Sequence, residues 1–387
     1  MLLLKNCNVF SPYNLGKKDI LIGLDKILSV QDDIKCPKNS FPQIDEIDLK
    51  GKIVIPGLID LHVHMIGGGG EGGFTTRTPE LYLSDFLRGG ITTAVGLLGT
   101  DAVTRSLPQL LGKARALDEE GIITYCWTGS YELPTRIISQ NPRSDIILID
   151  KIIGIGEIAV SDHRSSNPSL NQLTYIASEA RVGGMLSGKC GVLHIHLGDG
   201  KDGLKPVLDI LENSEVPYEN ILPTHINRNK RLFKEAIEFG KKGGYFDITS
   251  GITDDDDCVN PEDAFVKALE NGVNKNHMTF SSDGGGSMPS FDEEGRLLNL
   301  KQGDLSSQFN CLVKLLSKGI DMETALLPFT FNPSVLLKFP KEGRIFEGAY
   351  ANINILDLSF NLFGVISKGE KVLWDYEVKS FSQFERF

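Results

Sequence analysis

Short apolar runs alternate with longer amphipathic segments through the middle of the chain, between residues 56 and 342. Eight of these runs have the length and β-branched content of strands. They are Ile59–His64, Thr92–Gly99, Ile122–Thr128, Ile152–Ala159, Val192–Leu197, Ile221–His225, Tyr245–Thr249 and Met278–Asp283. Helix-like stretches fill most of the gaps, at Pro79–Leu87, Leu107–Glu120, Asn171–Arg181, Leu204–Glu215, Asn229–Lys241 and Pro261–Asn271, and two more follow the last run. This alternation predicts an α/β fold, a (β/α)8 TIM-type barrel, with a doubly wound open sheet as the alternative.

The two ends of the chain carry a different pattern, in which β-like runs are separated by turn-forming residues. These runs are Leu2–Phe10, Ile20–Leu24, Ile27–Val30 and Glu46–Ile55 near the start, and Asn352–Leu358 and Val365–Val372 near the end. We therefore expect residues 1–55 and 343–387 to form one small β-rich domain, similar to a β-sandwich. Residues 56–342 then form the barrel.

Composition narrows the possible partners of this 387-residue chain. Its formal net charge is −11 and it has no block rich in Lys or Arg, which argues against nucleic acid as a partner. No apolar run approaches the ~20 residues of a membrane helix, and the start of the chain lacks the pattern of a signal peptide. The six cysteines are scattered without a CxxC pair, so we expect neither disulfides nor a Cys-rich zinc site, and a cytoplasmic location.

The first predicted strand of the barrel carries the strongest chemical signal. Alternate residues of a strand face the same side, so His62 and His64 project together and Asp60 lies on the same face. Imidazole is a common zinc ligand, and two on one strand form half of a site. The plainer interpretation is two polar residues on a half-exposed strand. It is weakened by the glycine-rich segment Gly67–Gly70, which follows the pair directly.

Three more candidate ligands end other predicted strands: His196, His225 and Asp283. The carboxyl ends of barrel strands are where barrel enzymes place their chemistry, so these side chains are expected to converge with the first pair. Four of the seven histidines thus fall at ligand positions. We interpret His194 as a core or supporting residue.

Longer motifs accompany these residues, and together they resemble the amidohydrolase superfamily. Between about residues 50 and 340 the chain more closely resembles the isoaspartyl dipeptidases of that superfamily. The motifs that carry this resemblance are Gly67–Gly72, Thr75–Glu80, Gly96–Asp101, Ser161–Ser165, Pro223–Asn229 and Asp247–Ser250.

The resemblance implies two divalent metal ions, with zinc as the expected metal. His62, His64 and Asp283 would hold the first ion, His196 and His225 the second. Where the family has a carboxylated lysine that bridges both ions, this chain has Glu157. Glutamate also ends in a carboxylate but is about 3–4 Å shorter, and Gly154 and Gly156 would permit the closer backbone approach that it needs. A single-metal site and a decayed site are the alternatives to a bridging glutamate.

The resemblance also implies a substrate and a mechanism. The matching substrate-binding positions are Gly69, Gly70, Glu71, Thr100, Tyr131, Arg164, Arg228 and Ser287. One acid and two arginines complement an isoaspartyl dipeptide, which has one ammonium and two carboxylates. A metal-bridging hydroxide would attack the β-linked amide, with Tyr131 stabilising the oxyanion and Asp283 acting as general base and acid. Family members assemble as homo-oligomers, so we expect an octamer.

Two other functions remain open from the sequence. A dihydroorotase-like enzyme or an N-acyl-amino-acid hydrolase would share the metals and differ in its loops. A non-catalytic barrel relic is the second alternative, because the family lysine is missing. The acidic run Asp254–Asp257 is interpreted as a solvated loop.

Overall fold

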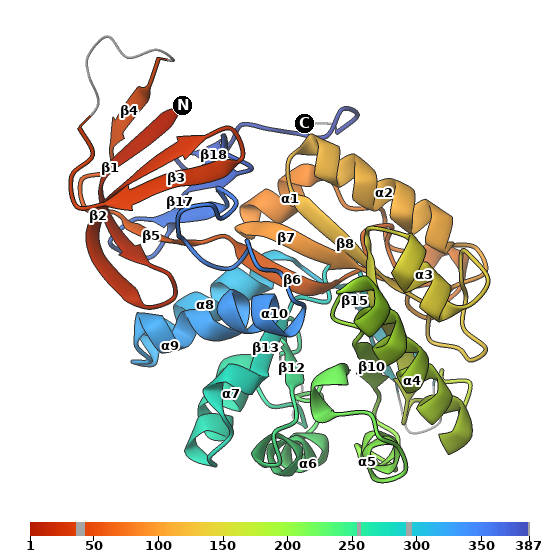
Figure 1. Cartoon of the computed structure of the whole chain (residues 1–387). Helices are drawn as coiled ribbons and strands as arrows, with labels where there is room; N and C mark the ends of the chain where they lie inside the picture. Colours follow the sequence, from red (N-terminus) through yellow and green to blue (C-terminus); the bar gives the residue numbers. More distant parts are fainter. Residues whose placement is uncertain (36–42, 254–256, 292–295, 386–387) are drawn as a thin grey trace.

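The computed structural model describes residues 1–35, 43–253, 257–291 and 296–385, and within these ranges both ends of the chain build one sheet (Figure 1). Its strands are β1 (Leu2–Phe10), β2 (Asn14–Gly23), β3 (Lys26–Gln31), β4 (Asp45–Asp48), β5 (Ile53–Pro56), β16 (Ile353–Leu356), β17 (Leu362–Ser367), β18 (Glu370–Trp374) and β19 (Glu377–Val378). The order is β19-β18-β17-β16-β5-β1-β2-β3, with β4 paired to β1. The antiparallel pair β5–β16 joins the two ends of the chain in this sheet.

The apolar side chains of this sheet form their own core, which includes Val9, Ile20, Val54 and Ile353. The predicted run 46–55 is divided into β4 and β5. Lys50 and Gly51 both have positive φ, 51° and 82°, and so form a turn inside the run.

A parallel sheet of six strands forms the centre of the molecule. Its strands are β6 (Leu58–Val63), β7 (Ile91–Gly96), β8 (Ile123–Thr128), β9 (Ile152–Val160), β10 (Leu193–Leu197) and β11 (Ile221–Thr224), and they pair in consecutive order. A doubly wound sheet would instead reverse its order at a switch point. β12 (Phe246–Thr249) and β13 (Met278–Ser281) form a separate parallel pair. A parallel bridge between Val63 and Gly284 brings the segment after β13 alongside the end of β6.

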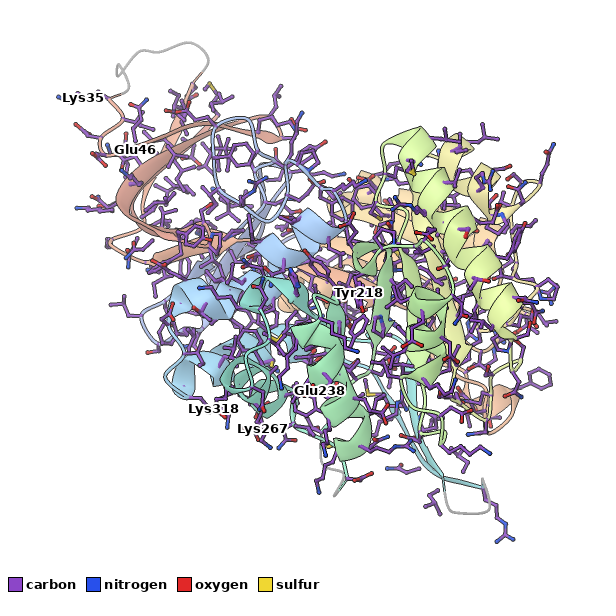
Figure 2. The ribbon with its side chains drawn as sticks, turned by 60° about the horizontal axis from the view of Figure 1, so that its bottom comes forward. Lys35, Glu46, Tyr218, Glu238, Lys267 and Lys318 are labelled. Atoms are coloured by element: carbon purple, nitrogen blue, oxygen red, sulfur yellow. The ribbon has the colours of Figure 1, made fainter. Side chains whose placement is uncertain are left out.

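Helices follow most of these strands and surround the parallel strands on the outside (Figure 1). They are α1 (Leu83–Arg88), α2 (Leu107–Glu120), α3 (Pro142–Leu148), α4 (Leu170–Ser187), α5 (Lys205–Glu212), α6 (Lys230–Lys241), α7 (Pro261–Glu270), α8 (Ser306–Ser317), α9 (Met322–Leu326) and α10 (Phe331–Leu336). Their outer faces carry exposed charged residues such as Glu238, Lys267 and Lys318 (Figure 2). Among the described residues, no helix combines the length and the apolarity that a membrane crossing needs.

The hairpin of β14 (Ser287–Phe291) and β15 (Leu297–Gln302) follows the last parallel strand. The sequence analysis does not predict this hairpin, and it also misses α3. Ser287, at the base of the hairpin, is one of the residues that line the main cavity described below.

Candidate metal centre and active site

The predicted ligands lie at or near the carboxyl ends of four strands, and Glu157 lies within a fifth, β9. His62 is in β6 and His64 follows it, while His196 is near the end of β10. His225 and Asp283 lie just beyond β11 and β13, and both adopt positive φ angles, 60° and 55°. Non-glycine residues with positive φ are uncommon and gather at functional sites, where the surrounding structure holds them in place.

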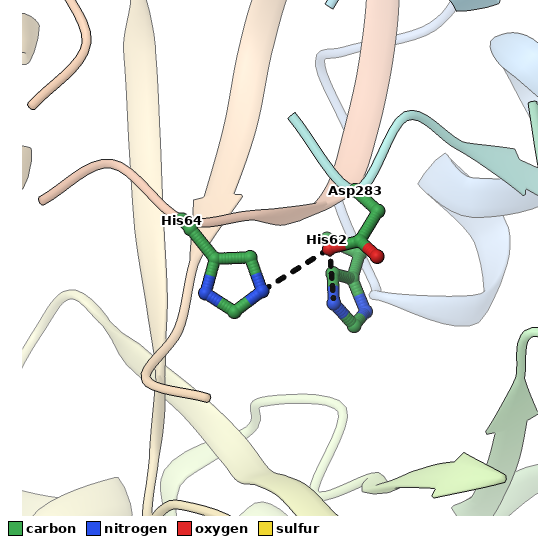
Figure 3. A group of neighbouring side chains, drawn as sticks. All are labelled: His62, His64 and Asp283. Atoms are coloured by element: carbon green, nitrogen blue, oxygen red, sulfur yellow. Dashed lines mark ion pairs between the residues drawn. The ribbon is translucent and has the colours of Figure 1, made fainter. Parts of the chain in front are cut away.

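The first group of ligands consists of His62, His64 and Asp283 (Figure 3). Oδ1 of Asp283 lies 3.4 Å from Nε2 of His62 and 3.1 Å from Nε2 of His64. All three side chains are buried. This is the grouping that the resemblance implies for the first metal ion.

Glu157 lies between the two groups of histidines. Its Oε2 atom is 3.5 Å from Nε2 of His62, 3.6 Å from Nε2 of His225 and 3.1 Å from Nδ1 of His196. Its Oε1 atom is 3.5 Å from Nε2 of His64. One carboxylate therefore faces all four histidines, which is the arrangement a bridging ligand requires.

Several buried polar atoms of this cluster have no hydrogen-bond partner among the described residues: Nε2 of His62, Oε1 of Glu157 and Oδ1 of Asp283. Buried polar atoms without partners are costly to a folded protein. Here they face one another, and nitrogen and carboxylate oxygen are the donor set that zinc prefers. The residues present therefore fit divalent metal ions.

The ionisation of the cluster suits cations as well. Burial alone would raise the pKa of Glu157, but the neighbouring imidazoles, first His62 and then His196 and His225, hold it well below its usual value. Burial likewise opposes ionisation of Asp283, whose pKa is nevertheless lowered by its contacts with His62 and His64. Burial lowers the pKa of His225 to about 3, so this ring is neutral and its lone pair is available.

His194 supports His62 from beneath. Nδ1 of His194 lies 3.1 Å from the carbonyl oxygen of Leu222, and its Nε2 lies 2.8 Å from Nδ1 of His62. A carbonyl only accepts, so these acceptors assign the proton of His194 to Nδ1 and make its Nε2 the acceptor for His62. In the neutral form of His62, the lone pair then lies on Nε2, which faces Glu157 and Asp283. The supporting role expected for His194 thus has a specific geometry.

The backbone near Glu157 is unusually close to β10. The pairing of β9 with β10 shifts register between Leu193 and Ile195, so one extra residue of β9 is accommodated there. A Cβ atom on Gly156 would lie 2.9 Å from the carbonyl oxygen of His194. A side chain at this position is therefore excluded, as the sequence analysis expects. Bulges of this kind redirect side chains next to active sites, which brings the short glutamate into the cluster.

A cavity of about 1020 Å³ opens above the cluster. The predicted residues that line it are His64, Gly69, Glu71, Thr100, Tyr131, Arg164, His196, Arg228, Asp283 and Ser287. Gly70 belongs to the same loop but is not part of the lining, and His62, Glu157 and His225 lie beneath it. Asp257 lines the cavity, whereas Asp254 to Asp256 of the acidic run lie outside the described residues.

Polar contacts organise the cavity wall around Glu71. Oγ of Ser287 lies 2.9 and 3.0 Å from its two carboxylate oxygens, and Oγ1 of Thr100 is 3.4 Å from Oε1. Across the cavity, the hydroxyl of Tyr131 lies 2.9 Å from Nδ1 of His196. Burial, and then the charge of Glu157, raise the pKa of Tyr131, so its phenol keeps its proton.

Two residues without a role in the sequence analysis support this wall. Asp162, within the Ser161–Ser165 motif, contacts both His196 and Arg164. Arg105, which is almost fully buried, donates to the carbonyls of Ile66 and Gly68 and so fixes the glycine-rich loop. Their spacing in the sequence gives no sign of these contacts, because each partner lies far along the chain or on a loop.

The chain is similar to proteins of known structure along nearly its whole length. A family model described as Amidohydrolase family matches residues 45–96. The crystal structure of a β-aspartyl dipeptidase from Fervidobacterium islandicum AW-1, in complex with a β-Asp-Leu dipeptide, matches with a TM-score of 0.92 and 43% identity, covering 99% of this chain and 100% of that chain. A second structure of that dipeptidase gives a TM-score of 0.90 at 41% identity with the same coverage. A dihydroorotase from Carboxydothermus hydrogenoformans is 23% identical, covering 93% of this chain and 89% of its own length.

Proposed function

The chain belongs to the β-aspartyl dipeptidase family of amidohydrolases, and we propose from this premise that it hydrolyses the β-linked amide of isoaspartyl dipeptides. The observation that carries the proposal is the position of Glu71, Arg164 and Arg228 in one cavity above the His and carboxylate cluster. An isoaspartyl dipeptide has one ammonium and two carboxylates, and these three charged side chains complement it.

Two divalent metal ions, for which zinc is our choice, complete the site. His62, His64 and Asp283 would hold one ion, His196 and His225 the other, and Glu157 would bridge them. When bound, the ions acidify a shared water and polarise the scissile carbonyl. The unpartnered buried atoms of the cluster support this assignment.

The remaining steps belong to the side chains. Tyr131 keeps its proton at neutral pH, so its hydroxyl can donate to the oxygen that becomes negative when the amide is attacked. The carboxylate of Asp283 is ionised, so it can take a proton from the attacking water and return it to the leaving amine. Both side chains line the cavity and are within reach of one bound molecule.

The substrate would lie across the cavity with its ammonium on Glu71. Ser287 and Thr100 orient that carboxylate. Gly69 lines the same end and Gly70 follows it in the loop, while Arg164 and Arg228 would bind carboxylates. Nε of Arg228 has no hydrogen-bond partner among the described residues, so it is free to donate to one.

We also propose the finer architecture that the sequence predicts. β12 and β13 would close the six-stranded sheet into a (β/α)8 barrel over 56–342, with 1–55 and 343–387 as the small β-rich domain. The chain would assemble as a homo-octamer in the cytoplasm. Leu148 on α3 and Met185 and Leu186 on α4 are apolar and 66–74% exposed, which supports burial of these helices between copies.

The test is an assay of the zinc-loaded protein on β-Asp-Leu, with α-Asp-Leu as the isomeric control. We expect leucine release from the β-linked substrate and two zinc equivalents per chain. Dihydroorotate and N-acyl amino acids test the alternative that the dihydroorotase relatives suggest. Turnover of either without turnover of β-Asp-Leu would overturn the proposed substrate, and a protein that binds no metal would be the non-catalytic relic.

A further inference from the structure

Asp162 lies between the metal half and the substrate half of the cavity. It is 8% exposed, and it follows β9 in a turn. Its Oδ2 atom is 2.9 Å from Nε2 of His196 and 2.7 Å from Nη2 of Arg164. Its Oδ1 atom accepts from Nε of Arg164 at 3.0 Å. One buried carboxylate therefore contacts both a metal-ligand candidate and a substrate-binding candidate.

The contact with His196 determines which nitrogen of that ring is bare. Asp162 offers only acceptor atoms, so a His196 ring that donates to it from Nε2 has Nδ1 as its only nitrogen for a lone pair. In a neutral ring the lone pair then lies on Nδ1. Nδ1 is the atom that faces Glu157, at 3.1 Å from Oε2. Carboxylates that hold metal-binding histidines in this way fix the ring orientation and strengthen the ligand.

The contact with Arg164 fixes the orientation of its guanidinium group on the substrate side of the cavity. The guanidinium uses Nε and Nη2 for the two oxygens of Asp162, and the backbone N–H of Arg164 donates to Oδ1 at 2.8 Å. A two-point contact of this kind sets the plane of an arginine. Nη1 is left pointing toward Glu71, at 3.2 Å from Oε1, on the cavity side.

The neighbouring strand leaves space for this arrangement. Gly198, two residues after His196, has no side chain, and a Cβ atom there would lie 2.5 Å from Cβ of Asp162 and 2.6 Å from its Oδ2. Any larger residue at this position would displace the carboxylate. The close approach of Gly198 is a second, independent sign that Asp162 has a defined position.

We propose that Asp162 is a positioning residue that couples the two halves of the site: it holds His196 with Nδ1 toward the metal position and holds Arg164 in the orientation that binds a substrate carboxylate. The Arg164 half of this inference rests on the proposed function. The part of the inference that involves His196 concerns metal binding alone. A plain structural ion pair is the competing explanation, and it predicts an effect on stability only.

Asp162→Asn separates these explanations. An amide is neutral and has one acceptor atom in place of two, so it weakens the charge-assisted bonds to both His196 and Arg164, and its NH2 group opposes the donors at one of the two oxygen positions. We expect one of the two zinc equivalents to bind about tenfold or more weakly in a chelator-buffered titration. We also expect KM for β-Asp-Leu to rise about tenfold, while KM stays the same for one of two analogues that each lack one carboxylate, β-Asp-leucinamide and β-Ala-Leu, because that analogue lacks the group that Arg164 binds.

Two comparison variants sharpen the test. Arg164→Met should raise KM for β-Asp-Leu and leave zinc affinity unchanged, because Asp162 can still hold His196. Glu179→Gln removes another largely buried carboxylate, paired with Arg143 between α3 and α4 and outside the cavity. It should lower the melting temperature and change neither zinc affinity nor KM. If Asp162→Asn does not fold, Gly198→Ala is the second variant, and it should weaken zinc binding and raise KM together.

Each result decides part of the proposal. Wild-type zinc affinity in Asp162→Asn overturns the coupling through His196, and an unchanged preference for β-Asp-Leu over both analogues overturns the coupling through Arg164. An effect like that of Glu179→Gln would make Asp162 structural. A wild-type protein that leaves β-Asp-Leu intact contradicts the proposed function and the Arg164 half, whereas the zinc titration still decides the His196 half.

Discussion

Oε1 of Glu71 lies 3.2 Å from Nη1 of Arg164, so two charges proposed to bind the ammonium and a carboxylate of the substrate neutralise each other in this structure. Both side chains are about nine-tenths buried, which makes an unpaired charge at either position costly. A substrate ammonium can replace Arg164 at Glu71, and this exchange frees Arg164 for a substrate carboxylate. Binding of the substrate ammonium at Glu71 should therefore favour binding of a substrate carboxylate at Arg164.

Glu71→Gln should lower kcat/KM for β-Asp-Leu by about ten- to a hundredfold. A hydrogen bond between charged groups contributes about 1.5–3 kcal/mol, and 1.4 kcal/mol corresponds to a factor of ten. The variant should lose little toward N-acetyl-β-Asp-Leu, which lacks the ammonium and which the wild type should already process poorly. Glu80→Gln, an exposed carboxylate in the same segment, is the control and should match the wild type. Equal losses on both substrates would show that Glu71 does not bind the ammonium.

Zinc loading should be independent of bicarbonate. Glu157 is a carboxylate without modification, whereas a lysine at this position would need carbon dioxide to become one. Lys151 is the lysine nearest to Glu157 in the sequence. It lies just before β9 begins, at the end opposite to the cluster, and it donates to the carbonyl of Thr124 at 3.0 Å. The measurement is zinc content after reconstitution of metal-free protein with and without bicarbonate. Glu157→Gln should retain at most one equivalent in either condition, and a strong bicarbonate effect would mean that a lysine is the bridge.

Much of the site could be predicted because its signals are local. His62 and His64 alternate along one strand, and the other ligands fall at strand ends, so a parallel fold alone brings them together. All eight predicted strands are present, with bounds that differ from the observed ones by at most three residues. Prediction was weaker for short elements, because their few residues show no clear periodic pattern. The seven residues of α3 are too few to show a helical period, and the β14–β15 hairpin lacks a distinct turn signal.

The contacts that orient the ligands could not be predicted. His194 acts on His62 across 132 positions, and Asp162 acts on His196 across 34. Their effect depends on which nitrogen of a ring faces which acceptor, and that follows only from the packed arrangement of neighbouring strands. The register shift at Glu157 is a similar case, because nothing in Gly154-Ile155-Gly156 specifies where the extra residue lies.

Gly156→Ala should displace Glu157 and weaken zinc loading. The added methyl would lie 2.7 Å from Cβ of His194 and 2.9 Å from its carbonyl oxygen, so β9 and β10 would have to separate. We expect a lower melting temperature and fewer than two zinc equivalents. Gly112→Ala is the matched control, because Gly112 is within α2 and nothing lies within 4 Å of the added atom. That variant should be stabilised by up to about 1 kcal/mol through helix propensity. Full zinc loading in Gly156→Ala would show that the close strand approach is unnecessary.

Asp247 should make the metal-free protein less stable as the pH rises from about 4 to about 6. Burial raises the pKa of this carboxyl from its ordinary 3.8 to about 6, against the lowering effect of hydrogen bonds from Ser281, Thr224 and Thr279. In this pH window the unfolded chain has lost the proton that the folded chain keeps, so the free energy of unfolding falls as pH increases. The full change is about 3 kcal/mol, since one pKa unit corresponds to about 1.4 kcal/mol.

Asp247→Asn removes this titration while it keeps the shape of the side chain, and the three hydroxyls can rotate to accept from its amide group. We expect the variant to gain about 2 kcal/mol relative to the wild type between pH 4.5 and pH 7. The measurement is urea denaturation of both proteins at the two pH values, with a chelator present so that bound cations do not lower the pKa of the carboxyl. A constant difference between the two proteins would show that Asp247 is already ionised at pH 4.5 and that its three hydroxyl donors outweigh burial.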